Sequence, residues 1–201
     1  MTPEPPSPIE VSAPPLAGGL WRRWQRFAVR RRTAFTLLIL APLLVFARPA
    51  VPLYLLGLAS VVTGVAIRVA ASGYLLKEEE LATNGPFAHT RNPLYLGSLF
   101  VALGVLVMSG LWVAFVPVLG FFAFLYYTTI LDEEGLLRER FGPDYLDYCA
   151  RTPRFVPRPR APAGSWGSFR WDRVWLNKEH VNALGVALAC LALAVRPLLS
   201  L

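Results

Sequence analysis

The sequence predicts an all-α, polytopic membrane protein with about five transmembrane helices. Of its 201 residues, 55% are hydrophobic and only 16% are charged, whereas soluble domains carry about 25% charged residues. Long apolar runs recur along the chain and suit helices that cross a bilayer. The basic residues gather between these runs, which follows membrane topology better than the continuous positive face that nucleic acid needs. The expected partner is therefore the lipid bilayer, and no nucleic acid.

The first residues of the chain differ from the rest in composition. Residues 1–19 are rich in Pro and lack hydrophobic periodicity, which predicts a disordered tail. Residues 20–32 mix Trp and Phe with Arg, which is typical of a basic interfacial segment on an anionic membrane, with a solvated linker as the alternative. We expect residues 33–160 to form the membrane-embedded core, and residues 161–201 to form a linker and a C-terminal transmembrane helix.

Five apolar stretches are the expected transmembrane helices, and small residues such as Gly57 and Gly64 in the second stretch suit close helix packing. The positive-inside rule places the N-terminus in the cytoplasm, because most Lys and Arg then lie on the cytoplasmic side. The preference for Arg over Lys favours a bacterial inner membrane. The five stretches are Thr33–Ala47, Leu53–Leu76, Leu94–Met108, Leu111–Leu131 and Val181–Leu199.

The polar loops that this topology places in the cytoplasm contain two motifs, and the first is Gly85–Gly97. Asn92 precedes Pro93, so its backbone should be extended and Pro93 should open the third helix. The positive end of that helix can attract an anionic ligand group. Phe87 and Tyr95 offer aromatic faces for a nucleobase. A plain loop that leads into a helix is the alternative.

The second motif begins with Asp132-Glu133-Glu134, directly after the fourth apolar stretch. A carboxylate at the membrane boundary is costly unless it has a partner, so a binding role is one interpretation. The alternative is a solvated helix end in which Glu134 pairs with Arg138, four residues later. An amphipathic helix should continue to Gly142. The two tyrosines after it are expected to anchor it at the membrane interface, namely Tyr145 and Tyr148.

Arg68 lies inside the second apolar stretch. A charge within a membrane span is rare and usually has a partner or a ligand. Snorkelling of the side chain toward the cytoplasm is the competing explanation.

Taken together, these segments resemble the isoprenylcysteine carboxyl methyltransferase family and its relatives, the phospholipid N-methyltransferases. That family has a Gly-x-Tyr…Arg-His-Pro-x-Tyr-x-Gly segment that opens a transmembrane helix and, one helical hairpin later, Glu-Glu-x-x-Leu-x-x-x-Phe-Gly-x-x-Tyr-x-x-Tyr. The resemblance covers roughly residues 57–157 and includes a counterpart of Arg68. Asn92 stands where the family has His, and Phe87 where it has Tyr. The matching residues are Gly85, Phe87, Arg91-Asn92-Pro93-Leu94-Tyr95-Leu96-Gly97, Glu133-Glu134, Leu137, Phe141-Gly142, Tyr145 and Tyr148.

The resemblance implies a membrane methyltransferase that uses S-adenosylmethionine. In the family this cofactor lies in a cytosol-facing pocket, and the lipid part of the substrate enters from the bilayer. Carried over by position, Glu133 would hold the ammonium end of the methionine moiety, with Arg91 and Glu134 as supporting charges. No metal site is expected. The residues implied to line the cofactor site are Leu81, Ala82, Phe87, His89, Arg91, Asn92, Pro93, Leu94, Tyr95 and Glu133.

The implied reaction is methyl transfer to a lipid-like or prenylated acceptor, which is either a carboxylate or an amine. A carboxylate needs no base, whereas an amine must lose a proton, for which Glu134 or His89 would serve. Thr129 stands where the enzymes that methylate prenylcysteine carry an Arg, and Arg68 is the residue that would supply this charge instead. The expected catalytic residues are therefore Arg68 and Glu134.

Two other function classes stay open. A sterol-reductase-like enzyme shares an Arg-x-x-x-Tyr segment, here Arg91 to Tyr95, and would bind NADPH; such enzymes lack the continuation after Glu133-Glu134. A non-catalytic membrane scaffold of the same fold is consistent with Asn92 and Thr129 at positions where the enzymes carry other residues.

Overall fold

The computed structural model describes residues 41–76, 80–160 and 167–199. Within these ranges every regular element is a helix and there is no strand, which confirms the all-α prediction. The predicted tail, the predicted basic interfacial segment and most of the first predicted span lie outside them; residues 41–46 are helical. The named elements, with η for a 3-10 helix, are α3 (Val51–Ser72), η1 (Gly85–Ala88), α4 (Pro93–Ser109), η2 (Trp112–Ala114), α5 (Phe115–Arg151), α6 (Trp171–Leu176) and α7 (Glu179–Leu199).

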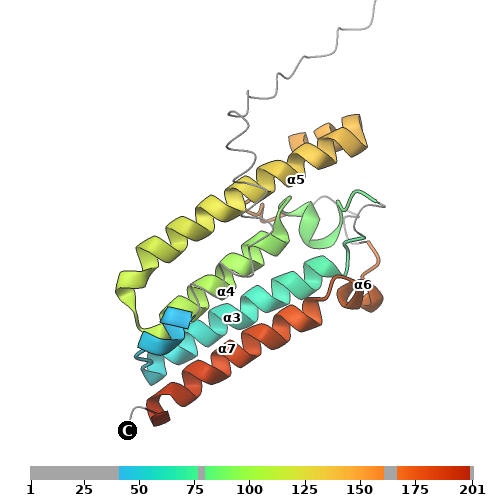
Figure 1. The fold of residues 1–201 in the computed structure, drawn as a ribbon. Coiled ribbons are helices and arrows are strands. Elements are labelled where there is room, and N and C mark those ends of the chain that lie inside the picture. The colour runs from blue at the N-terminus through green and yellow to red at the C-terminus, as the bar shows by residue number, and fades with distance from the viewer. Residues whose placement is uncertain (1–40, 77–79, 161–166, 200–201) are drawn as a thin grey trace, which may run out of the picture.

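The long helices form one layered bundle. Figure 1 shows α5, α4, α3 and α7 packed side by side in that order. α3 ends at Ser72, and α4 and α7 begin at the same end of the bundle, at Pro93 and Glu179. We call this the polar end, because the acidic residues of α5 also lie there. The candidate site is found at this end, and the last turn of α7 lies at the other (Figure 1).

α3 and α4 pack with their backbones in contact at paired glycines. A Cβ atom on Gly57 would lie 2.4 Å from the carbonyl oxygen of Gly104, and one on Gly64 would lie 2.5 Å from that of Gly97. Small residues at such positions let membrane helices approach closely, as predicted for Gly57 and Gly64. The contact fixes how far α4 lies along α3, and hence where the first turn of α4 is placed.

The lengths of the helices fit an integral membrane protein. Three helical segments are long and apolar enough to cross a membrane, namely Val51–Ser72, Trp112–Arg151 and Glu179–Arg196. They correspond to the second, fourth and fifth predicted spans. The third predicted span is α4, which is apolar but has 17 residues and is only about 25 Å long. By length and composition, the described residues therefore support three of the five predicted spans.

α5 has an apolar first half and a polar second half, and its regular path breaks at Gly142. This glycine has φ 50° and ψ −123°, a conformation that residues with a Cβ rarely adopt. The sequence predicted that the amphipathic helix ends here, but the chain resumes helical geometry and continues to Arg151. The part of α5 after Gly142 runs in a new direction, which brings Tyr148 into contact with Phe87, before α4.

Candidate functional site

The start of α4 and the polar half of α5 meet at the polar end of the bundle. Pro93 opens α4, as predicted, and Asn92 before it has φ −126° and ψ 54°, outside the helical region. Tyr95, in the same first turn, donates a hydrogen bond from its hydroxyl to Oε1 of Glu133 at 2.6 Å. The two sequence motifs, which are separated by a helical hairpin, therefore come together through these side chains.

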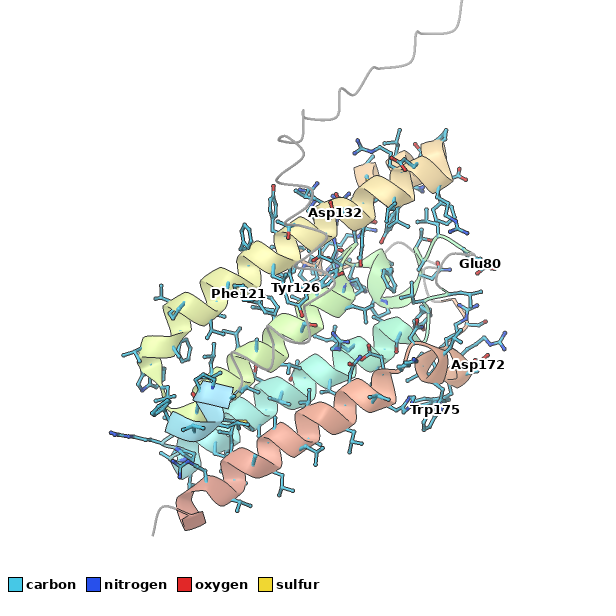
Figure 2. The ribbon with its side chains drawn as sticks, in the orientation of Figure 1. Glu80, Phe121, Tyr126, Asp132, Asp172 and Trp175 are labelled. Atoms are coloured by element: carbon cyan, nitrogen blue, oxygen red, sulfur yellow. The ribbon has the colours of Figure 1, made fainter. Side chains whose placement is uncertain are left out.

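Aromatic rings from α5 lie on one side of Tyr95. The ring of Tyr95 lies edge-on to that of Tyr126, with ring centroids 5.0 Å apart, and the Phe122 ring lies 4.1 Å from Tyr126. Figure 2 shows Tyr126 and Asp132 following one another along α5 toward the polar end. Glu133 is exposed. The arrangement places a solvent-accessible carboxylate beside rings that can pack against an apolar or planar group.

Glu134, unlike its neighbour Glu133, is buried, with 7% of its surface exposed. Nη2 of Arg154 lies 2.8 Å from Oε2, and Nε lies 3.1 Å from both carboxylate oxygens. Nη1 of Arg91 lies 3.2 Å from Oε1. These guanidinium groups replace the water that the carboxylate loses on burial, and the hydrogen bonds that Arg154 donates to Glu134 raise the pKa of Arg154. The alternative pair with Arg138 does not form, because Glu134 is turned inward while Arg138 is exposed.

The residues that lead into α4 are held by a segment that comes after α5. We call residues 152–158 the strap; it has no regular secondary structure and lies beside residues 87–92. The amide of Arg91, the hydroxyl of Thr90 and Nδ2 of Asn92 donate to carbonyls of the strap at 2.9, 3.0 and 2.9 Å. Asn92 makes no side-chain capping bond to α4. The strap therefore fixes the turn before α4 in place of a helix cap.

Tyr145 and Tyr148 are buried, with 1% and 5% of their surface exposed, so the prediction that they anchor the helix at the membrane interface is wrong. The Tyr148 hydroxyl donates to the carbonyl of Phe87 at 2.8 Å. The change of direction at Gly142 explains the error, since it turns these rings toward η1 rather than toward lipid. Phe87 is buried as well, and its role beside a nucleobase stays a prediction.

The other predicted cofactor residues lie on the connection between α3 and α4. Leu81 and Ala82 are half-buried in the segment before η1, and Pro93 is fully buried. Nδ1 of His89 lies 2.8 Å from a carbonyl of the strap; because a carbonyl only accepts, this nitrogen carries the proton. The residues that connect α3 to α4 thus lie at the same end of the bundle as Glu133. That they contact a cofactor stays a prediction.

Arg68 has a protein partner, in agreement with one of the two explanations drawn from the sequence. Its Nε and Nη2 bind the Glu179 carboxylate at 3.0 and 2.7 Å, and its Nη1 donates to Ser98 and to the carbonyl of Leu94. The carbonyl of Leu94 and the hydroxyl of Ser98 contact Arg68 on α3, whereas the hydroxyl of Tyr95 contacts Glu133 on α5. The described contacts therefore do not bring Arg68 together with the carboxylates of α5, and its catalytic role stays a prediction.

Two of the partners were not predicted, namely Arg154 for Glu134 and Glu179 for Arg68. Arg154 lies in an Arg- and Pro-rich segment, and Glu179 lies two residues before the last apolar stretch. A general signal did point to them, since a buried charge near a membrane needs an opposite charge. The sequence has many arginines, and only the folded path of the chain shows which of them pairs with Glu134.

A comparison with protein families identifies the region that contains these contacts. Residues 50–144 match the family model described as phospholipid methyltransferase. The match confirms the family resemblance drawn from the two motifs, and it includes Tyr95, Glu133 and Glu134. The strap and α7 lie outside it.

Curated proteins are similar to part of this chain. It is 38% identical over 84 residues to the nickel-cobalt-cadmium resistance protein NccN of Alcaligenes xylosoxydans xylosoxydans. It is 39% identical over 83 residues to the cobalt-zinc-cadmium resistance protein CzcN of Cupriavidus metallidurans. The matches cover 41% of this chain and 38% of each relative, so the chain spans less than half of their length. No solved structure matches it significantly. Among the residues that the structure describes, no group of His, Cys, Asp or Glu is arranged to hold a metal ion.

Proposed function

Residues 50–144 carry a phospholipid methyltransferase domain, and from this premise we propose that the protein transfers a methyl group from S-adenosylmethionine to a lipid-like or prenylated acceptor held in the membrane. The observation that carries the proposal is the hydrogen bond between Tyr95 and Glu133, which joins the two family motifs at one place. We further propose that the polar end faces the cytoplasm of a bacterial cell, in accordance with the positive-inside rule.

The chemistry of the side chains at this place fits the cofactor. Glu133 is exposed and uses Oε1 to accept from Tyr95, so its carboxylate suits the ammonium group of the methionine moiety. α4 begins at Pro93, so the positive end of its helix dipole lies here and suits the carboxylate of the same moiety. The rings of Tyr95 and Tyr126 offer aromatic surface for the nucleobase. The charges at this place are thus complementary to the ammonium and carboxylate groups of the ligand.

The protein's contribution to the reaction is positioning. When bound, S-adenosylmethionine supplies an electrophilic methyl group. The chain has to hold an acceptor in line with that methyl group and keep water away, which accounts for most of the acceleration expected of such a site. A carboxylate acceptor needs no base. For an amine acceptor Glu134 is the proposed base, and one arginine has to release it first, because both of its oxygens accept hydrogen bonds from guanidinium groups.

Calorimetry on the purified full chain in detergent tests this proposal. S-adenosylmethionine should bind, and Glu133→Gln should weaken that binding by about tenfold or more, the effect of losing one charge-assisted hydrogen bond. Glu139→Gln is the matched control, because Glu139 is also exposed and lies on the same helix. Binding of NADPH in place of S-adenosylmethionine would point to a reductase, and binding of neither to a scaffold; both results contradict the proposal.

A further inference from the structure

A partly buried ion pair joins α7 to α3 at the polar end. The guanidinium of Arg68 and the carboxylate of Glu179 form two hydrogen bonds, of 3.0 and 2.7 Å, and their side chains are 21% and 7% exposed. Nδ2 of Asn182 donates to the same carboxylate at 3.1 Å. Glu179 occupies the first turn of α7, where the helix dipole favours a negative charge. Both charges of the pair are therefore well compensated.

The same guanidinium reaches a third helix. Nη1 of Arg68 donates to the hydroxyl of Ser98 and lies 3.4 Å from the carbonyl oxygen of Leu94, which also accepts from Ser98 at 2.9 Å. Gly97 provides the room for this contact, since a Cβ atom there would lie 2.6 Å from Cγ of Arg68. Arg68 thus lies across the first turn of α4, whose Leu94 directly precedes Tyr95 in the chain.

We propose that Glu179, acting through Arg68, is a positioning residue for the cofactor site. The carboxylate holds the guanidinium against Leu94, this contact holds the first turn of α4, and that turn presents Tyr95 to Glu133. The proposal rests on the proposed function. It makes α7 part of the methyl-transfer unit, although α7 lies outside the residues that match the family.

Neutralising Glu179 leaves the guanidinium of Arg68 without its opposite charge. A partly buried cation in this situation moves toward water, and a long arginine side chain can do so. Arg68 then leaves the carbonyl of Leu94, and the first turn of α4 is no longer held from the α3 side. The Tyr95 hydroxyl shifts relative to Glu133, and small displacements of that kind weaken a preorganised site.

The test compares stability and cofactor affinity in the full-length chain, by thermal unfolding and by calorimetry with S-adenosylmethionine. The variants are Glu179→Gln, the conservative Glu179→Asp, and the double variant Arg68→Leu/Glu179→Leu. Tyr54→Phe is the matched control, because the Tyr54 hydroxyl also joins α3 to α7, through the carbonyl of Cys190 at 3.2 Å, but away from the site.

Glu179→Gln should weaken S-adenosylmethionine binding by about tenfold, and Glu179→Asp by much less, as expected when a positioning contact is lost or kept. The double variant separates stability from positioning. Leucines in place of such an ion pair usually keep the stability of the protein, but they cannot donate a hydrogen bond to the carbonyl of Leu94. It should unfold near the wild-type temperature and still bind about tenfold more weakly. If Glu179→Gln does not fold, the double variant carries the test alone.

The proposal is overturned if affinity recovers together with stability in the double variant, or if Tyr54→Phe weakens binding as much as Glu179→Gln. Failure of the proposed function is a different result, since wild-type protein would then not bind S-adenosylmethionine at all. Wild-type binding that is sensitive to Glu133→Gln but not to Arg68→Leu/Glu179→Leu would leave the proposed function standing and remove Glu179 from it.

Discussion

The hydroxyl of Tyr95 donates a 2.6 Å hydrogen bond to Oε1 of Glu133, 38 residues later in the chain. The bond joins the first turn of α4 to the point at which α5 changes from apolar to polar. On its far side from Tyr95, the α4 turn is held by Arg68, and the residues before it are held by the strap.

Tyr95→Phe removes the hydroxyl and keeps the ring beside Tyr126. We expect S-adenosylmethionine to bind about fivefold to tenfold more weakly, because Glu133 loses one fixed donor, while the unfolding temperature changes little. Tyr127→Phe is the control, since Tyr127 is an exposed tyrosine on α5, next to Tyr126. Calorimetry on Tyr95→Phe, Glu133→Gln and the double variant should give non-additive losses. Additive losses would mean that the two side chains act independently.

Glu134→Gln should destabilise the protein rather than affect binding alone. The substitution leaves Arg91, whose side chain is 13% exposed, without a counter charge, and breaking a buried ion pair in this way costs about 3 kcal/mol. The measurement is the unfolding temperature in detergent. Arg138→Gln should change nothing, because Arg138 is exposed and the carboxylate binds other arginines. A large effect of Arg138→Gln would support the solvated helix end considered from the sequence.

Tyr148→Phe tests whether the second piece of α5 supports the turn before α4. The carbonyl of Phe87 loses its donor, and a buried acceptor left without a partner costs about 1–3 kcal/mol. We expect a lower unfolding temperature and faster proteolysis within the strap. Leu146→Ala is the comparison, since Leu146 is exposed on the same piece of helix. Equal stability of Tyr148→Phe and wild type would show that the hydroxyl has no such role.

Gly104→Ala tests the contact between α3 and α4. A Cβ atom there would lie 2.5 Å from the carbonyl oxygen of Gly57, so the helices must separate, at a cost of about 1–3 kcal/mol. Gly120→Ala meets no atom within 4 Å and should stabilise α5 by about 0.5–1 kcal/mol, since alanine favours a helix more than glycine. Thermal unfolding of the two variants should therefore give shifts of opposite sign.

Much of the fold could be predicted because its signals are local. Apolar runs located α3, α4, the first half of α5 and α7, and the Asn92-Pro93 pair located the start of α4. Gly110, with φ 67°, ends α4 where a left-handed residue is needed. The break at Gly142 was also predicted, but not the helix after it, because Pro143 can end a helix or begin one.

The candidate-site residues that lie inside the two motifs could be predicted, whereas their partners from other parts of the sequence could not. Arg91 and Glu134 were expected as supporting charges, and they lie within 3.2 Å of one another. Arg154 pairs with Glu134 because of the path of the strap, and Glu179 pairs with Arg68 because of the packing of α7. Neither the path nor the packing can be predicted from a single sequence. The tyrosines after Gly142 were misjudged for the same reason, since spacing alone does not distinguish a lipid-facing ring from a buried one.

The most direct test of the central claim is transfer of a labelled methyl group from S-adenosylmethionine into the lipid extract of membranes that contain the protein. We predict transfer with wild type and Glu139→Gln, and a loss of at least about tenfold with Glu133→Gln. Equal transfer by wild type and Glu133→Gln, at subsaturating S-adenosylmethionine, would contradict the claim that Tyr95 and Glu133 mark the site of methyl transfer.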